Sequence, residues 1–230
     1  MNKIDIRVAI IDNSIDKSIY DPVNHWSQFL DVKWVSFRAK KSDFPDDTRK
    51  NFTHIILTGS EASIMDRSPW VLDEIEFVKE AVSQKIPILG SCYGHQMIAL
   101  ALAGPQCVRR SPFPEIGWIP IKILRENALL GKKGLFHSYT IHFDEVIGLG
   151  NDYDILASTD LCSIHAFQKK KSCVWGIQSH PEISPEKGKT LLKNLINQGE
   201  GPLDIYKKAL CSIPEDSGII KHIIDAFIKY

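Results

Sequence analysis

The chain has 230 residues, and its 28 lysines and arginines are balanced by 28 aspartates and glutamates. A chain of this length suits one domain and can bury a full core without disulfides or metals. The zero net charge argues against nucleic acid as a partner. The longest apolar run is far shorter than the roughly 18 residues of a membrane-spanning helix, so we expect no membrane partner.

Two further features bear on where the protein works. Residues 1–5 lack the charged-then-apolar pattern of a signal peptide. The five cysteines have no regular spacing, which does not suggest a disulfide framework. Because a reducing compartment keeps thiols free, we expect a cytoplasmic protein.

The first part of the chain alternates between strand and helix patterns. The apolar run at 6–11, broken only by Arg7, predicts a buried strand. The patterns that follow predict helices at 22–30 and 70–83 and strands at 32–37, 54–58 and 87–89. This alternation is typical of an α/β fold with a doubly wound, mostly parallel central sheet flanked by helices.

A cysteine lies on a tight turn directly after the last of these strands. Residues 90–94 read Gly-Ser-Cys-Tyr-Gly, and a helical pattern follows at 95–103. This is the spacing of a nucleophile elbow, in which a sharp strand-to-helix turn exposes one side chain at the edge of a sheet. The N–H groups at the start of the helix favour the thiolate of Cys92. A thiol buried in a core helix is the alternative, and the flanking glycines favour the elbow.

The chain between Gly117 and residue 178 has a different texture. Its patterns predict shorter strands at 118–124, 139–147, 155–158, 163–168 and 174–178, joined by turns. We therefore expect a small antiparallel β layer that leads back into the main sheet.

His180 follows the last of these strands, and Pro181 after it favours extended geometry at the histidine. Glu182 can then hold one imidazole nitrogen while the other faces Cys92, which is the logic of a catalytic triad with sulfur as the nucleophile. Most His-Pro-Glu triplets are surface turns, so this motif indicates a catalytic histidine only in combination with the elbow around Cys92.

Three motifs that are distant in sequence each follow a predicted strand. They contain Gly59, Cys92 and His180. Because the chemistry of a parallel sheet lies at the carboxyl ends of its strands, we expect these residues to meet at one edge.

Helix patterns return at the C-terminal end of the chain. Ser184 and Pro185 form a good helix start, and two more helices are predicted at 203–210 and 217–230. The last one carries an apolar stripe of Ile219, Ile220, Ile223, Ile224 and Phe227. We expect this tail to pack on the domain, and a docking surface for a partner is the alternative.

These motifs resemble those of the class I, or triad-type, glutamine amidotransferases. The stretches that carry the resemblance are residues 55–60, 90–96, 115–118, 142–146 and 176–182. The resemblance runs from about residue 6 to about residue 195 and looks closest to the amidotransferase domain of guanosine monophosphate synthetase and its stand-alone relatives. It implies a flavodoxin-like fold for domain 1–200. Residues 201–230 lie beyond the resemblance, and we expect them to form a C-terminal helical extension packed on the same domain.

The resemblance also implies roles for individual residues. The catalytic residues are expected to be Cys92, His180 and Glu182. Gln96 is expected to help bind the substrate glutamine, and the segment around His142 and Phe143 to contact its amino-acid part, largely through the backbone.

An oxyanion hole is implied as well. In the family the turn after the third strand supplies one backbone N–H, and the residue after the cysteine, here Tyr93, supplies another. Many relatives carry Gly-Gly-Pro where this chain has Gly59, Ser60 and Glu61. The N–H of Gly59 or of Ser60 is therefore expected to complete the hole.

Other histidines fit catalysis or metal binding less well. His95 lies three residues after Cys92, but a nucleophile on an elbow points away from its own helix. His137, His142 and His165 lie in the β-rich part without the short paired spacings of a zinc site. We expect no metal and no cofactor.

The resemblance implies hydrolysis of the γ-carboxamide of glutamine through a γ-glutamyl thioester on Cys92. The chain has no Walker-type phosphate loop, so ammonia would need a separate synthase partner as its acceptor. Two alternatives stay open at this point. One is a stand-alone hydrolase of γ-glutamyl peptides or amides, and the other is a catalytically retired scaffold protein.

Overall fold

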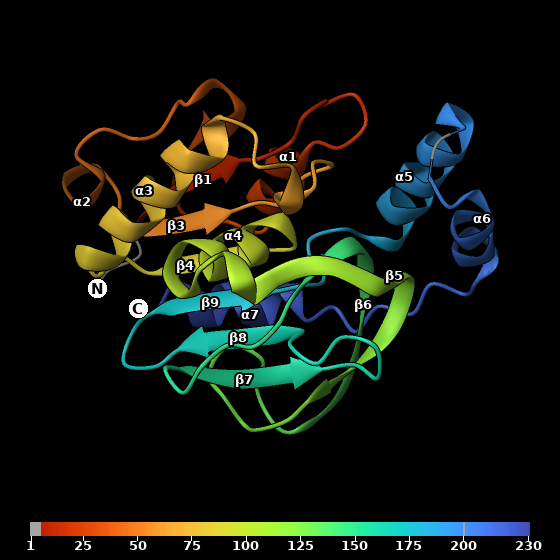
Figure 1. The fold of residues 1–230 in the computed structure, drawn as a ribbon. Coiled ribbons are helices and arrows are strands. Elements are labelled where there is room, and N and C mark those ends of the chain that lie inside the picture. The colour runs from red at the N-terminus through yellow and green to blue at the C-terminus, as the bar shows by residue number, and fades with distance from the viewer. Residues whose placement is uncertain (1–5, 200) are drawn as a thin grey trace.

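Nine strands form one continuous sheet in the computed structural model, which describes residues 6–199 and 201–230. Across the sheet they follow the order β2-β1-β3-β4-β9-β8-β7-β5-β6 (Figure 1). Residues 1–5, in which no signal pattern was recognised, lie outside the described part. Among the described helices, none has both the length and the apolar character needed to cross a membrane.

Five neighbouring strands run parallel and form the half of the sheet that the alternating pattern predicted. They are β1 (Arg7–Asp12), β2 (Lys33–Arg38), β3 (His54–Leu57), β4 (Ile88–Ser91) and β9 (Val174–Ile177). All pairings among them are parallel. The central strands β3, β4 and β9 are buried along their whole length, as expected when helices cover both faces. The predicted α/β class is confirmed.

The antiparallel strands continue this sheet instead of stacking on it as a second layer. They are β5 (Val108–Ile123), β6 (Gly134–Val146), β7 (Tyr153–Ser158) and β8 (Ala166–Lys169). β8 pairs antiparallel with β9 and so joins the two halves. β5 begins well before the predicted residue 118, because a register shift between Arg110 and Glu115 accommodates Pro112 and Pro114, which lack an N–H to donate.

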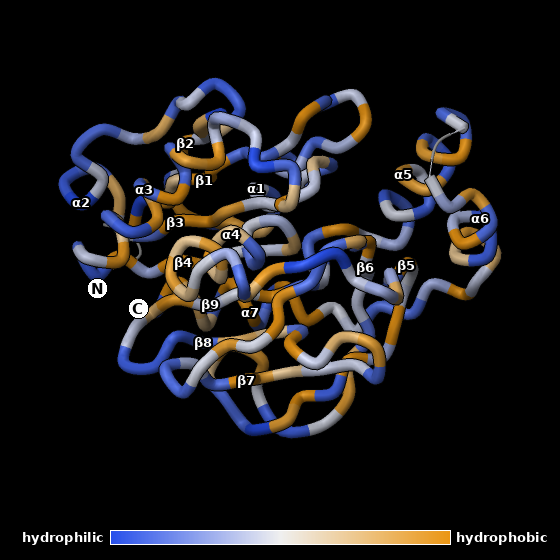
Figure 2. The backbone as a smooth tube through the Cα atoms, in the orientation of Figure 1, coloured by the Kyte–Doolittle hydropathy of each residue, from blue (hydrophilic) through white to orange (hydrophobic). Residues whose placement is uncertain are grey.

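Helices cover both faces of the parallel half (Figure 1). The α-helices are α1 (Pro22–Ser27), α2 (Thr48–Asn51), α3 (Trp70–Ser83), α4 (Tyr93–Ala103), α5 (Pro185–Gln198), α6 (Leu203–Cys211) and α7 (Ile220–Phe227), and short 3₁₀ helices lie at Ala39–Lys41, Ile64–Asp66 and Pro105–Cys107. Alternate residues of β1 serve opposite faces: Ala9 and Ile11 pack with α3 and α4, whereas Val8 and Ile10 pack with α1 and α7. Figure 2 shows the resulting hydrophobic centre along β3 and β4.

The last helix uses its apolar stripe inside the molecule. Its buried members are Ile220, Ile223, Ile224 and Phe227. They join the core on the face of the sheet that α1 also covers, where the ring of Phe227 lies 5.1 Å from that of His54. The domain boundary at residue 200, which is itself outside the described residues, stays a prediction.

The start of α4 lies in close contact with the end of β3. The N–H of Gly94 donates to the carbonyl oxygen of Thr58 at 3.1 Å. A Cβ at Gly94 would lie 2.2 Å from the carbonyl oxygen of Leu57, so the backbones can approach this closely only with glycine at this position. This contact sets the start of α4 beside the carboxyl ends of β3 and β4.

We expect Gly94→Ala to lower the free energy of unfolding by about 1–3 kcal/mol, because the added methyl group overpacks a contact with backbone atoms. Gly134→Ala is the matched control, since a Cβ there meets nothing within 4 Å. Urea unfolding of both variants measures the difference. Equal stabilities for the two would contradict this account of the β3–α4 contact.

Candidate active site

The three motifs that follow predicted strands meet at one edge of the sheet. The strands that end at them, β3, β4 and β9, are direct neighbours. The Cys92 N–H donates to Ile177 O and the His180 N–H to Tyr139 O, both at 2.8 Å. A cavity of about 340 Å³ opens here, and both Cys92 and His180 line it. The structure brings these residues together at one edge of the sheet, as the sequence predicts. The catalytic roles expected for them stay predictions.

Cys92 occupies a strained turn between β4 and α4. Its φ of 48° and ψ of −102° are rare for a residue with a side chain, and such strain is typical of active-site residues. Glycines on either side permit the turn, since a Cβ at Gly90 would lie 2.4 Å from the carbonyl oxygen of Gly94. The sulfur lies 3.7 Å from the carbonyl oxygen of Ile141 and stands at the positive end of α4.

His180 and Glu182 form a buried pair beside this cysteine. The imidazole Nδ1 lies 2.8 Å from the carboxylate Oε1, and both side chains are almost fully buried. Burial disfavours the charged imidazolium, but the thiolate of Cys92 and the carboxylate of Glu182 outweigh it and raise the pKa of His180 to about 10. The surroundings of His180 therefore favour its protonated form.

Tyr20 is a part of the site that the sequence analysis missed. Its hydroxyl donates to Glu182 Oε1 at 3.1 Å and lies 3.3 Å from His180 Nδ1, and its ring packs edge-on against the imidazole. Burial, followed by the charge of Glu182, raises the pKa of Tyr20 well above its usual value, so the hydroxyl stays a donor. The sequence signal that could have identified Tyr20 is its place in the loop after β1, which lies at the same carboxyl edge of the sheet.

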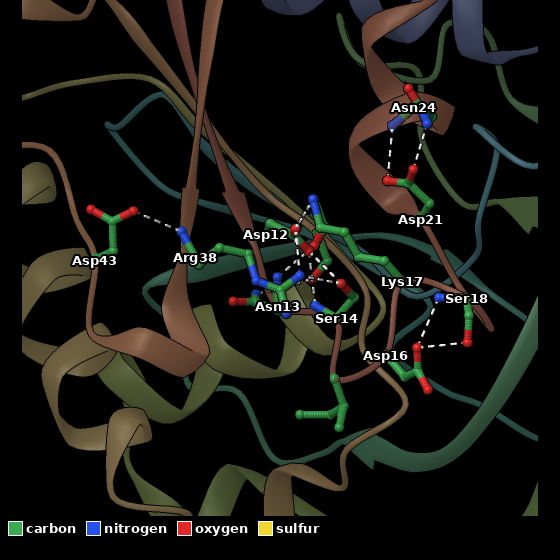
Figure 3. A network of polar contacts seen from close by, with 12 residues as sticks. Asp12, Asn13, Ser14, Asp16, Lys17, Ser18, Asp21, Asn24, Arg38 and Asp43 are labelled. Atoms are coloured by element: carbon green, nitrogen blue, oxygen red, sulfur yellow. Dashed lines mark hydrogen bonds and ion pairs between the residues drawn. The ribbon is translucent and has the colours of Figure 1, made fainter.

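A polar network anchors the loop that carries Tyr20 (Figure 3). Asp12 Oδ2, which is fully buried, lies 2.8 Å from the Arg38 guanidinium and 3.0 Å from Lys17 Nζ. Burial alone would raise the pKa of Asp12, but hydrogen bonds from Ser14, Arg38 and Lys17 hold it below its usual value. The carboxylate is therefore a stable anchor for the start of the loop.

Glu61 ties the same loop to the turn after β3. Its two carboxylate oxygens accept the N–H groups of Ile15 and Asp16 at 2.9 and 3.1 Å. These two contacts fix the loop that brings Tyr20 to the His180–Glu182 pair.

The expected oxyanion-hole residues lie around the same cavity. A Cβ at Gly59 would lie 2.5 Å from His180 Cε1 and 3.0 Å from the Tyr20 hydroxyl, so glycine is required for this close approach. Ser60 and Tyr93 line the cavity, and the Ser60 hydroxyl accepts the N–H of Ala62 at 3.0 Å. Their roles as oxyanion donors stay predictions.

The three expected substrate-binding residues also line the cavity. The Gln96 amide nitrogen donates to Asp144 O at 2.8 Å and to Gln178 Oε1 at 3.3 Å. The Arg110 guanidinium lies over the ring of Phe143, with Cζ 5.6 Å from the ring centroid. His142 is bound on both sides by protein groups, so its imidazole is not free for a substrate.

The partners of His142 belong to a buried polar group beside the cavity. His142 Nε2 lies 3.0 Å from Glu115 Oε2, and Nδ1 lies 3.1 Å from Asp144 O. Glu115, His142 and His165 offer three possible metal-ligand atoms within 4.8 Å of one another. Burial, with the neighbouring His142, lowers the pKa of His165 well below its usual value. The Glu115–His142 contact links β5 to β6, whereas His165 Nε2 lies 3.9 Å from Glu115 Oε2 and has no hydrogen-bond partner among the described residues.

The remaining histidines lie elsewhere. His137 pairs with Glu215 at 3.1 Å and does not belong to this group. His95 is fully buried against Phe167, and burial lowers its pKa to about 3. All five cysteines carry free thiols, and Cys92, Cys107 and Cys162 are buried.

The chain is similar to known proteins over most of its length. The family model described as Glutamine amidotransferase class-I matches residues 9–198. The chain is 36% identical over 178 residues to a subunit of the glutamine-hydrolyzing GMP synthase of Methanococcus maripaludis, covering 75% of this chain and 92% of that protein. It is 33% identical over 172 residues to the corresponding subunit of Sulfolobus acidocaldarius, covering 74% and 87%.

Longer proteins and solved structures are similar too. The chain matches only 31% of the GMP synthase of Wigglesworthia glossinidia brevipalpis, at 32% identity over 70% of this chain. A crystal structure of a glutamine amidotransferase from Methylobacillus flagellatus superposes with a TM-score of 0.75 at 19% identity, covering 97% of this chain and 94% of that one. One from Thermotoga maritima gives 0.72 at 16% identity, covering 97% and 96%. At these identities the two structures support the fold alone.

We expect the pKa of His180 to fall from about 10 when Cys92 is replaced by alanine, because burial lowers this pKa and Cys92 makes the largest contribution that raises it. NMR titration of the imidazole measures the change. Cys107→Ala removes another buried thiol outside the cavity lining and is expected to leave the titration of His180 unchanged. Identical titrations in both variants would show that Cys92 does not raise the pKa of His180.

Proposed function

The chain belongs to the class I glutamine amidotransferase family, and on that premise we propose that it hydrolyses the γ-carboxamide of glutamine through a γ-glutamyl thioester on Cys92. The ammonia released is delivered to a separate synthase partner. The observation that carries this proposal is the buried His180–Glu182 pair beside Cys92, which has a strained backbone and lines a cavity.

In the first half of the reaction the Cys92 thiolate attacks the γ-carboxamide carbon. Backbone N–H groups at Tyr93 and at Gly59 or Ser60 stabilise the developing oxyanion, an effect of roughly 3–4 kcal/mol per donor in comparable sites. The His180 imidazolium donates its proton to the departing nitrogen, and ammonia leaves.

In the second half water attacks the thioester carbon. Neutral His180 takes a proton from this water, the carbon–sulfur bond breaks, and glutamate and the Cys92 thiolate are released. Glu182 keeps the imidazole oriented in both steps, and the Tyr20 hydroxyl holds Glu182.

A partner for the ammonia is supported by the relatives and by the chain itself. Two relatives that match over most of their length are named as one subunit of a glutamine-hydrolyzing GMP synthase. The chain has no phosphate-binding loop of its own with which to activate an acceptor. The complete nucleophile, base and orienting acid argue against a retired scaffold.

Cys92→Ala is expected to abolish glutamate release from glutamine without unfolding the protein, because it removes the nucleophile. Cys107→Ala is the control and is expected to keep wild-type turnover, since this thiol lies outside the cavity lining. Glutamate release is measured in the presence and absence of a candidate synthase. Turnover that persists in Cys92→Ala would refute the proposed chemistry.

Tyr20→Phe is expected to lower kcat by about tenfold with little change in KM, because a hydrogen bond to a charged group is lost beside the base. Tyr139→Phe is the matched control: its ring also lies near His180, but its buried hydroxyl has no hydrogen-bond partner among the described residues. Steady-state kinetics across pH measure both variants. Equal kcat and equal pH profiles would show that the Tyr20 hydroxyl does not position the pair.

A further inference from the structure

The buried group of Glu115, His142 and His165 lies directly beside the catalytic cavity. His142 lines the cavity, and all three residues are at most 5% exposed. Glu115 on β5 is the cross-strand partner of His142 on β6, and His165 directly precedes β8. Each residue offers one candidate ligand atom, and these atoms lie within 4.8 Å of one another. The proposed thioester steps use none of these side chains.

Among the described residues, no lysine or arginine pairs with the buried Glu115 carboxylate. Its ion-pair contacts there are with the imidazoles of His142 and His165. Glu115 Oε1 accepts the Thr159 hydroxyl at 2.7 Å, and Oε2 is the oxygen directed at the imidazoles. A buried carboxylate without a partner is costly, so such groups are paired with a cation or coordinate a metal. The surroundings of Glu115 Oε2 therefore favour a positive charge.

The hydrogen bonds of His142 direct a lone pair at the same oxygen. His142 Nδ1 lies 3.1 Å from Asp144 O, and because a carbonyl oxygen can only accept, Nδ1 carries its hydrogen. In a neutral imidazole Nε2 then has no hydrogen, yet it lies 3.0 Å from Glu115 Oε2. Since two lone pairs in contact repel each other, either a proton or a metal ion belongs between these atoms.

His165 distinguishes a metal ion from a proton. A proton between His142 and Glu115 would leave His165 Nε2, 3.9 Å from Glu115 Oε2, with no hydrogen-bond partner among the described residues. A metal ion would use all three atoms. In a tetrahedral site with bonds of about 2.0–2.1 Å, ligand atoms lie about 3.3 Å apart. The observed separations of 3.0 and 3.9 Å therefore need only small shifts of the side chains.

Further contacts hold these side chains as they hold the ligands of metal sites. A ligating histidine usually donates its other ring N–H, and a ligating carboxylate is itself hydrogen-bonded. His142 and Glu115 have these contacts, with Asp144 O and the Thr159 hydroxyl. The backbone of His165 is fixed on both sides, because its N–H donates to Ala157 O at 2.9 Å and its carbonyl oxygen accepts the Gln178 N–H at 2.8 Å.

We propose that Glu115 Oε2, His142 Nε2 and His165 Nε2 bind a divalent transition-metal ion, with Zn²⁺ as the representative. Two imidazoles and one carboxylate form a known zinc ligand set, whereas Mg²⁺ and Ca²⁺ prefer oxygen ligands. The ion reaches the group from the cavity that His142 lines. Once bound, it ties β5 and β6 to the start of β8.

Histidine spacing could not indicate this group, which is why the sequence led us to expect no metal. The third ligand is a glutamate, and the three residues lie on segments that are far apart in the chain. Only the pairing of β5 with β6 and the position of His165 before β8 bring them together.

Zn²⁺ binding is measured by calorimetry in Cys92→Ala protein, so that the ion cannot bind the thiol in the cavity. We expect one equivalent to bind with a Kd of about 1 µM or tighter, because the ligands are already held by the fold. X-ray absorption of the zinc-loaded protein is expected to show nitrogen and oxygen ligands at about 2.0–2.1 Å and no sulfur. A weaker Kd, or a sulfur ligand, overturns the proposal.

A pair of variants in the same background locates the ion. His165→Gln removes the ligand that stands outside the Glu115–His142 contact, and we expect its Kd for Zn²⁺ to be at least tenfold weaker. His137→Gln is the matched control and is expected to keep the Kd within about twofold, since this imidazole contacts Glu215 instead. A change of less than tenfold in His165→Gln, or equal affinities in the two variants, overturns the assignment.

Glu115→Gln is a second variant, which decides the matter if His165→Gln does not fold. Its amide nitrogen can donate to the lone pair of His142 Nε2, while its amide oxygen still accepts the Thr159 hydroxyl, so the fold is expected to persist. We expect its Zn²⁺ affinity to fall at least tenfold, and Zn²⁺ to raise the Tm of the Cys92→Ala protein but not that of this variant. An unchanged affinity overturns the proposal. These measurements need no glutamine turnover, so their outcome is independent of the proposed function.

Discussion

The site depends on one steric constraint, the close approach of the turn between β4 and α4 to the end of β3. Gly90 and Gly94 have no Cβ, so their backbones can pack where any side chain would collide with backbone atoms. This packing holds Cys92 at a φ that is costly for a cysteine. Cys92 is thereby fixed at the start of α4, where it lines the cavity.

Electrostatics complete what this turn begins. A buried imidazolium is unfavourable by itself, but Cys92 and Glu182 outweigh the effect of burial and raise the pKa of His180. Tyr20 adds a neutral donor to Glu182 without adding charge. The loop that carries it is anchored by Asp12 and Glu61, so residues remote from the sulfur help to hold the His180–Glu182 pair.

The cavity around Cys92 and His180 is lined by residues from distant parts of the chain. Phe143 and Asp144 are neighbours on β6, and the Arg110 guanidinium lies over the Phe143 ring, so polar and carbon-rich groups are mixed in the lining. Helix α6 contributes Tyr206 to this lining, although it lies beyond the matched family region of residues 9–198.

The sequence by itself determined the alternating strands and helices, the elbow around Cys92 and the meeting of three strand ends, because periodicity and turn residues are local signals. Only the tertiary structure decided that the antiparallel strands extend the main sheet, that the Tyr20 hydroxyl contacts the His180–Glu182 pair, and that the His142 imidazole contacts Glu115. It also decided that α5 and α6 line the cavity. Strand pairing and side-chain contact depend on residues far apart in the chain, and no local pattern encodes which of them meet.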